Sequence, residues 1–157
     1  MFWTLGGNQV GKAAISGWLE VIAPAQRRGA KLWPFDGSLA KLGKTDHLVI
    51  AETYPAEAYS HVGMAFRANM SKRRQEDRCS AMAGLSGWAR RSEVAFSEEL
   101  TTQIEDGFGV RKAGEDPFDA LTGVLGMIEV LDGRRPEGVV EKASADLWEG
   151  WILGQAT

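Results

Sequence analysis

Three acidic residues stand at positions where carboxylates could meet to hold a metal ion. Glu52 follows a short apolar run, residues 48–51, that is typical of a buried strand, and a Tyr-Pro turn follows after Thr53. Asp116 and Asp119 belong to a second acidic group, EDPFDAL, which begins a strongly apolar helix. Magnesium and manganese ions accept oxygen ligands of this kind, and such ions promote phosphoryl displacement. Glu52, Asp116 and Asp119 are therefore the candidate catalytic and metal-binding residues.

Each of these acids also has a structural explanation. Asp116 directly precedes Pro117, an order typical of an N-cap residue followed by proline at the first helical position. Glu52 could cap the helix that follows it. Asp119 is harder to explain in this way, because it lies in a helix whose other faces are apolar. Its carboxylate must meet solvent, a basic residue or a metal ion.

Basic residues supply candidates for substrate binding. The segment KRRQEDR places Lys72, Arg73 and Arg78 near the start of a predicted helix, where they could contact a phosphate backbone. A solvated helix face is the competing interpretation, since acids interrupt the charge. Lys12 ends the P-loop spacing of GGNQVGK, but Ala13 replaces the hydroxyl residue that holds magnesium there. Lys12 could hold a single phosphate at a helix start, which is favoured over a nucleotide-binding P-loop, and the structural alternative is a Gly-rich helix entry with ordinary capping.

The order of these motifs resembles that of a bacterial and archaeal family described as predicted nucleases with an RNase H-like fold. Its members carry a Glu-x-Tyr-Pro strand end, a Lys/Arg-rich helix start and a late Asp-x-x-Asp-Ala helix. The likeness covers about residues 45–132. The matching residues here are Glu52, Tyr54 and Pro55, then Lys72, Arg73 and Arg78, and finally Asp116, Asp119 and Ala120.

The resemblance also implies what is missing. The family fold opens with a β-hairpin whose first strand supplies a leading aspartate, and this sequence has neither. We therefore expect a partial RNase H-like α/β fold that is helix-rich, with few strands and without the N-terminal β-hairpin strands. The chain would be a C-terminal portion, or a truncated or degenerate member, and we expect its three carboxylates to bind metal poorly without the leading aspartate.

Hydrophobic spacing locates the elements that must position these residues. It predicts helices over residues 8–23, 56–64, 71–90, 92–105 and 117–131, and strands over residues 31–35 and 47–52. Pro24 is expected to end or kink the first helix. We expect a single domain over residues 1–157, with a family-like core at 45–132 and a tail at 133–157 that packs back onto it.

Composition narrows the classes of protein. The chain has 157 residues, a net charge of −3 and a single cysteine, Cys79. The negative net charge argues against a protein that binds nucleic acid over its whole surface. The lone cysteine excludes an internal disulfide, and no signal peptide or membrane span is recognisable, so a cytoplasmic location is predicted. No nucleophile elbow accompanies the two histidines, which argues against a hydrolase triad.

Two functions of different classes follow. The leading hypothesis is a metal-dependent nuclease-like domain, in which magnesium or manganese supports phosphodiester hydrolysis of a nucleic acid. The alternative is a non-catalytic interaction domain, in which the acids are caps. There the partner is a second copy of the chain or a missing N-terminal segment that completes the sheet.

Overall fold

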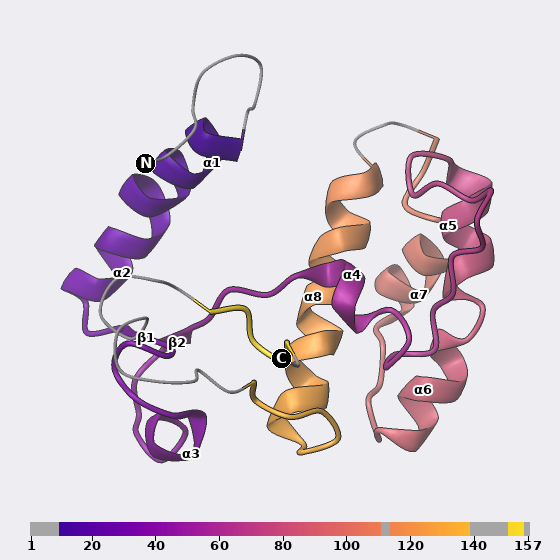
Figure 1. Ribbon diagram of the computed structural model, residues 1–157. Helices are drawn as coiled ribbons and strands as arrows, with labels where there is room; N and C mark the ends of the chain where they lie inside the picture. The colour runs from indigo at the N-terminus through magenta and orange to yellow at the C-terminus, as the bar shows by residue number, and fades with distance from the viewer. Residues whose placement is uncertain (1–9, 111–113, 139–150, 156–157) are drawn as a thin grey trace. The chain divides into compact units, whose positions relative to one another are not determined.

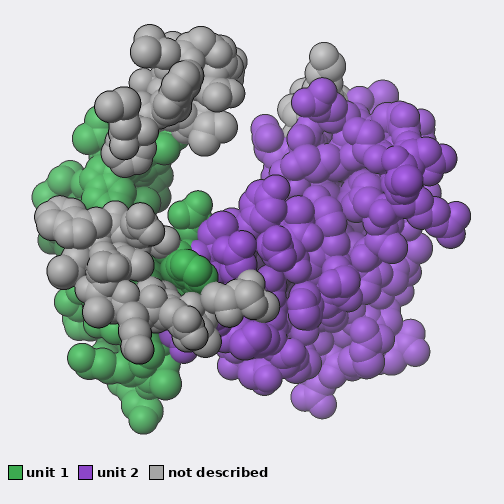
Figure 2. Space-filling model, in the orientation of Figure 1, with its two compact units in different colours: residues 1–52, 140–151 green, residues 53–139, 152–157 purple. Residues whose placement is uncertain are grey.

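The computed structural model describes residues 10–110, 114–138 and 151–155. The chain divides into two compact units, which Figure 2 distinguishes by colour. Unit 1 comprises Met1–Glu52 and Val140–Trp151, and unit 2 comprises Thr53–Val139 and Ile152–Thr157. Residues 6–9 of the Gly-rich motif and residues 139–150 and 156–157 of the predicted tail lie outside the described residues. A single domain over the whole chain stays a prediction.

Unit 1 begins with a helical stretch in three parts: α1 (Val10–Gly17), the π-helical η1 (Trp18–Ile22) and α2 (Ala23–Arg27) (Figure 1). Of the two alternatives predicted for Pro24, an end of the helix is wrong, because the helix continues to Arg27, and a kink stays a prediction. A π-helical turn shifts the register of the main-chain hydrogen bonds. This turn ends two residues before Pro24, which has no N–H to donate. The proline is thus accommodated in the first turn of α2.

Two short parallel strands follow, β1 (Lys31–Leu32) and β2 (Val49–Ile50), with Lys31 paired to Val49 and Leu32 to Ile50. The helix α3 (Leu39–Leu42) lies in the connection between them. Both strands fall inside the predicted ranges but are shorter. The expectation of a buried strand before Glu52 is wrong in one respect: Leu48 is exposed, and Val49 and Ile50 are only half-buried.

Unit 2 is helical: α4 (Pro55–Ala58), α5 (Gln75–Met82), α6 (Leu85–Arg91), α7 (Glu98–Glu105) and α8 (Glu115–Leu131). The long helix α8 packs beside α4 (Figure 1). Its buried face meets side chains from the other helices and loops in one apolar core. That core comprises Val62, Met64, Met82, Leu85, Trp88, Ala89, Phe118 and Leu125.

The predicted helix boundaries in unit 2 need four corrections, and the first is that the helix predicted over residues 56–64 runs only from Pro55 to Ala58. The helix predicted over residues 71–90 is two helices, since α5 ends at Met82 and α6 begins at Leu85. Gly84 in the break packs so closely that an added Cβ would lie 2.0 Å from the carbonyl oxygen of Gly63. The helix predicted over residues 92–105 begins only at Glu98, after the N-cap Ser97, whose hydroxyl accepts a hydrogen bond from the Leu100 N–H. Helix α8 begins at Glu115, so Asp116 lies inside it and is not its N-cap.

A buried acid joins α8 to α6. The Glu129 side chain is almost fully buried, and its Oε1 accepts a hydrogen bond of 2.7 Å from the Trp88 indole and another of 2.7 Å from Arg134. A buried carboxylate is tolerated when it is paired and hydrogen-bonded in this way. Glu129 therefore fixes the rotation of α8 about its axis.

The described structure is helix-rich with a small parallel sheet, which confirms the α/β class at this coarse level. Among the described residues, no helix is both long enough and apolar enough to cross a membrane.

We predict that Gly126→Ala destabilises the protein, because the new Cβ would lie 2.7 Å from Cβ of Ala58, where α8 packs on α4. Overpacking of this kind costs about 1–3 kcal/mol. Gly87→Ala on α6 is the control, since its nearest neighbour would be a side-chain nitrogen of Arg91 at 3.5 Å. Urea unfolding should show a loss of stability for Gly126→Ala alone. Equal stability of the two variants would contradict this packing.

Candidate functional site

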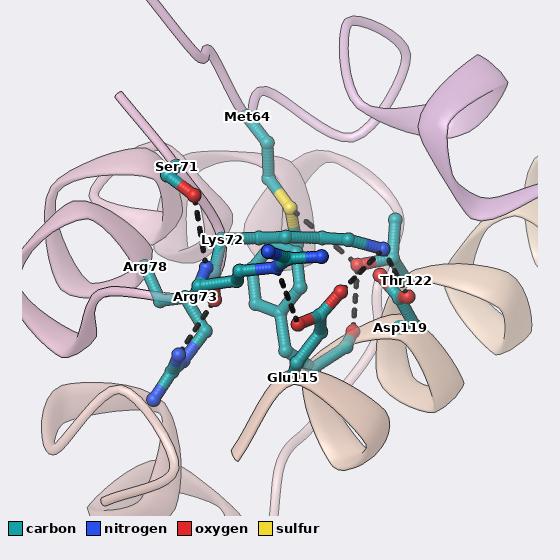
Figure 3. A network of polar contacts seen from close by, with 9 residues as sticks. Met64, Ser71, Lys72, Arg73, Arg78, Glu115, Asp119 and Thr122 are labelled. Carbon is teal, nitrogen blue, oxygen red and sulfur yellow. Dashed lines mark hydrogen bonds and ion pairs between the residues drawn. The ribbon is translucent and has the colours of Figure 1, made fainter. Parts of the chain in front are cut away.

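A lysine and an aspartate that lie 47 residues apart in the chain meet in unit 2 (Figure 3). The ammonium of Lys72 donates to Oδ2 of Asp119 at 2.5 Å. Lys72 precedes α5, and Asp119 projects from the second turn of α8. Their side chains remain 38% and 28% exposed, so the pair lies at the surface of the unit, within reach of solvent. Two residues that the sequence proposed for different roles are thus in direct contact.

Glu115 and Arg73 extend this pair into a cluster of four charged side chains, here called the Lys72 cluster: Lys72, Arg73, Glu115 and Asp119. Oε1 of Glu115 lies 3.3 Å from the Lys72 ammonium, and its Oε2 lies 3.9 Å from Nε of Arg73. Glu115 and Asp119 are four residues apart on α8, which places both carboxylates on one face of the helix. Arg73 is the most open member, with 77% of its side chain exposed.

The charges in the cluster perturb its titrating groups. Partial burial of Lys72 acts to lower its pKa, but the hydrogen bond and charge of Asp119, together with Glu115, raise the pKa above its ordinary value. Nearby, burial and the negative charge of Asp119 raise the pKa of the Tyr59 hydroxyl to about 12. The Tyr59 ring also packs against Phe66 and Phe118. Lys72 is therefore held in its charged form at neutral pH.

Arg78, proposed from the sequence as a phosphate contact, has a buried side chain. Its guanidinium donates to three main-chain carbonyls: those of Lys72, Gly107 and Gly109. In this arrangement its donors are directed inward, and Arg73 is the substrate-binding candidate of this segment whose side chain is most open to solvent.

The remaining candidates do not join the cluster in the described contacts. Asp116 is exposed in the first turn of α8. Glu52 is exposed and belongs to unit 1. Lys12 lies in α1, also in unit 1, and its side chain is outside the described residues. Within the described ranges, no group of three or more His, Cys, Asp or Glu side chains could hold a metal ion. Metal ligation by Glu52 and Asp116 stays a prediction.

The candidates named from the sequence do not include Glu115, a member of the Lys72 cluster, or Tyr59, whose hydroxyl the charge of Asp119 affects. Glu115 was one of the acidic residues of EDPFDAL, but the N-cap interpretation drew attention to its neighbour Asp116. Its spacing of four residues from Asp119 was the available signal, once the helix is known to begin at Glu115. Nothing in the sequence distinguishes Tyr59, because its relation to Asp119 depends on how α4 and α8 pack.

We compared the chain with protein-family models, with curated proteins and with solved structures, and it shows no significant similarity to any of them.

We predict that Tyr59 releases its proton at about pH 12 in the folded protein. The difference in tyrosinate absorbance between the unmodified protein and Tyr59→Phe isolates this titration. Asp119→Asn should lower the midpoint, because one of the charges that disfavour the phenolate is removed, whereas Asp116→Asn should leave it unchanged. An unfolded tyrosine ionises near pH 10. The folded protein therefore binds more protons between about pH 10 and 12, and its stability should fall as the pH rises through this range. An identical midpoint in the Asp119→Asn variant would place this carboxylate away from Tyr59.

Proposed function

We propose that unit 2 binds the phosphate backbone of a nucleic acid at the Lys72 cluster and, with a divalent metal ion, hydrolyses its phosphodiester bonds. The observation that carries this proposal is the contact between Lys72 and Asp119, joined by Glu115 and Arg73. Basic groups that could bind phosphate therefore lie beside carboxylates that could bind a metal ion, and phosphoryl transfer uses both kinds of group. Arg73, the most exposed of them, is available to a phosphate.

The carboxylate oxygens of the cluster are ligands of the type that magnesium and manganese prefer. Oδ1 of Asp119 is buried and has no hydrogen-bond partner among the described residues, while Oδ2 is bound to Lys72. Magnesium usually takes one or two protein carboxylates and completes its shell with water and substrate phosphate. Asp119 and Glu115 would hold such an ion, and Asp116 is a third candidate on the same helix. When bound, the metal would supply positive charge for activating water and stabilising the phosphoryl group.

An RNase H-like fold belongs to the same proposal. It is supported by the motif resemblance and by the meeting of two of its motifs, the Lys/Arg-rich segment at Lys72 and the Asp-x-x-Asp helix at Asp119. Glu52 belongs to the third motif and follows the end of β2 after one residue, Ala51, as expected of an acid at the end of a strand. Its part in metal binding rests on the sequence.

The alternative proposal is a non-catalytic interaction domain, and one observation favours it. Among the described residues of unit 1, several large apolar side chains of the first helical stretch are exposed: Ile15, Trp18, Leu19 and Val21. Exposed apolar residues that gather on one element are typical of a surface that associates with another chain. A second copy of this chain would be the simplest partner to test.

We predict that magnesium or manganese raises the melting temperature of the protein and that Asp119→Asn abolishes this rise. A ligand at one hundred times its dissociation constant stabilises the folded state by about 2.7 kcal/mol. Because Asp119→Asn also breaks the pair with Lys72, the quantity to compare is the metal-dependent shift within each variant. Glu76→Gln, an exposed acid of α5, is the control and should keep the full shift. No shift in any variant, combined with a dimer in light scattering, would favour the interaction domain.

We predict that Arg73→Gln weakens nucleic-acid binding equally for all sequences, because the contact is to phosphate. The slope of log affinity against log salt concentration should become shallower by about one unit, as expected when one phosphate contact is lost. Arg91→Gln, an exposed arginine of α6, is the matched control and should leave the slope unchanged. Equal losses in the two variants would indicate general charge attraction instead of a defined site.

A further inference from the structure

Arg78 is the most completely buried charged residue described in unit 2, with 0% of its surface exposed. Its Nε donates to the carbonyl of Gly107 at 2.7 Å, its Nη1 to that of Lys72 at 2.6 Å and its Nη2 to that of Gly109 at 2.6 Å. A buried guanidinium is expensive unless its donors are satisfied. Three short bonds to neutral carbonyls satisfy it here, and they fix the three carbonyls in return.

One of these carbonyls belongs to Lys72 itself (Figure 3). Lys72 lies in the segment before α5, where the main chain is outside any helix or strand. The bond from Arg78 therefore fixes the backbone of the residue whose ammonium meets Asp119 and Glu115. Without this bond, the same side chain would project from a less constrained segment.

Arg78 also contacts the start of the helix that carries the two carboxylates. A Cβ added to Gly114, directly before α8, would lie 2.5 Å from Nη2 of Arg78 and 2.7 Å from the carbonyl oxygen of Phe108. Only glycine fits against the guanidinium at this position. Arg78 thus lies between the segment that carries Lys72 and the first turn of the helix that carries Glu115 and Asp119.

We propose that Arg78 is a positioning residue, which holds the main chain of Lys72 against the start of α8 so that the Lys72 ammonium reaches both Asp119 and Glu115. Arg78 does not contact the substrate itself and acts only through Lys72. The inference rests on the proposed function in one respect, namely that Lys72 binds phosphate. The role requires arginine, because a planar fork of five donors reaches three separate carbonyls, whereas a lysine ammonium at the same place donates from one point.

The test is the reactivity of the Lys72 amine, read by site-resolved mass spectrometry after brief acetylation at mildly alkaline pH. An amine that is bound by two carboxylates is shielded from the reagent and reacts slowly, and it reacts faster when those contacts are lost. Arg78→Lys should raise the Lys72 rate about two- to fivefold, the factor expected when an exposed ion pair is lost. The exposed Lys41 and Lys44 in unit 1 are internal references and should not change.

A milder variant covers the case in which Arg78→Lys does not fold. Gly109→Ala strains a residue with φ of +83° whose carbonyl accepts from Arg78, and an added Cβ there would meet no atom closer than 3.8 Å. Gly133→Ala imposes similar strain at φ of +71° in open space, away from these contacts. The Lys72 rate should rise in Gly109→Ala and stay unchanged in Gly133→Ala.

The outcomes separate this inference from the proposed function. An unchanged Lys72 rate in folded Arg78→Lys or in Gly109→Ala would overturn the positioning role, and so would an equal rise in Gly133→Ala. Neither result depends on nucleic acid or metal. If the Lys72 rate responds as expected but Arg73→Gln leaves nucleic-acid binding unchanged, the positioning role stands and the proposed function fails.

Discussion

The arrangement of unit 2 depends on satisfying one buried guanidinium. Arg78 has no exposed surface, and its three carbonyl partners come from two separate segments, the residue Lys72 and the turn after α7. That turn runs through Gly107, Phe108 and Gly109, all with positive φ. Glycine adopts this conformation at little cost, whereas Phe108 is an uncommon case. The turn directs two carbonyls toward one side chain, and the chain then enters α8 past Gly114, where there is no room for a Cβ.

Helix α8 is held in position along its whole length, because polar side chains near its start, middle and end contact other parts of unit 2. Asp119 meets Lys72 near its start, and the buried Thr122 hydroxyl donates to the sulfur of Met64, outside the helix, at 3.7 Å. Glu129 near its end binds Trp88 and Arg134. A helix with a purely apolar face could shift or rotate against its neighbours with little loss of stability. These polar contacts form only at one position and rotation of α8. The position of the Asp119 carboxylate is therefore set by contacts at both ends of the helix.

The sequence predicted the elements better than their contacts. The apolar helix α8 and the acids at its start were recognisable from periodicity, and so was the basic segment at Lys72. The inward direction of Arg78 was not, since a run of Lys and Arg interrupted by acids is typical of a solvated face. The break at Gly84 escaped prediction because its cause, close packing against Gly63, is a tertiary contact. The same holds for Glu115, whose pairing with Lys72 depends on where the helix begins and on which segment lies beside it.

The Lys72 cluster is poorly explained as a device for stability. Ion pairs between side chains as exposed as Lys72 and Asp119 contribute about 0–1 kcal/mol, and the 3.9 Å contact between Arg73 and Glu115 contributes little within that range. The buried Oδ1 of Asp119 without a partner among the described residues acts against folding by about 1–3 kcal/mol. Glu129, by contrast, is paired and hydrogen-bonded, as a structural acid should be. Two acids on one helix thus differ in kind. Asp119 is partly exposed, but its buried Oδ1 has no partner among the described residues beside the charged Lys72, which supports a role in binding a ligand.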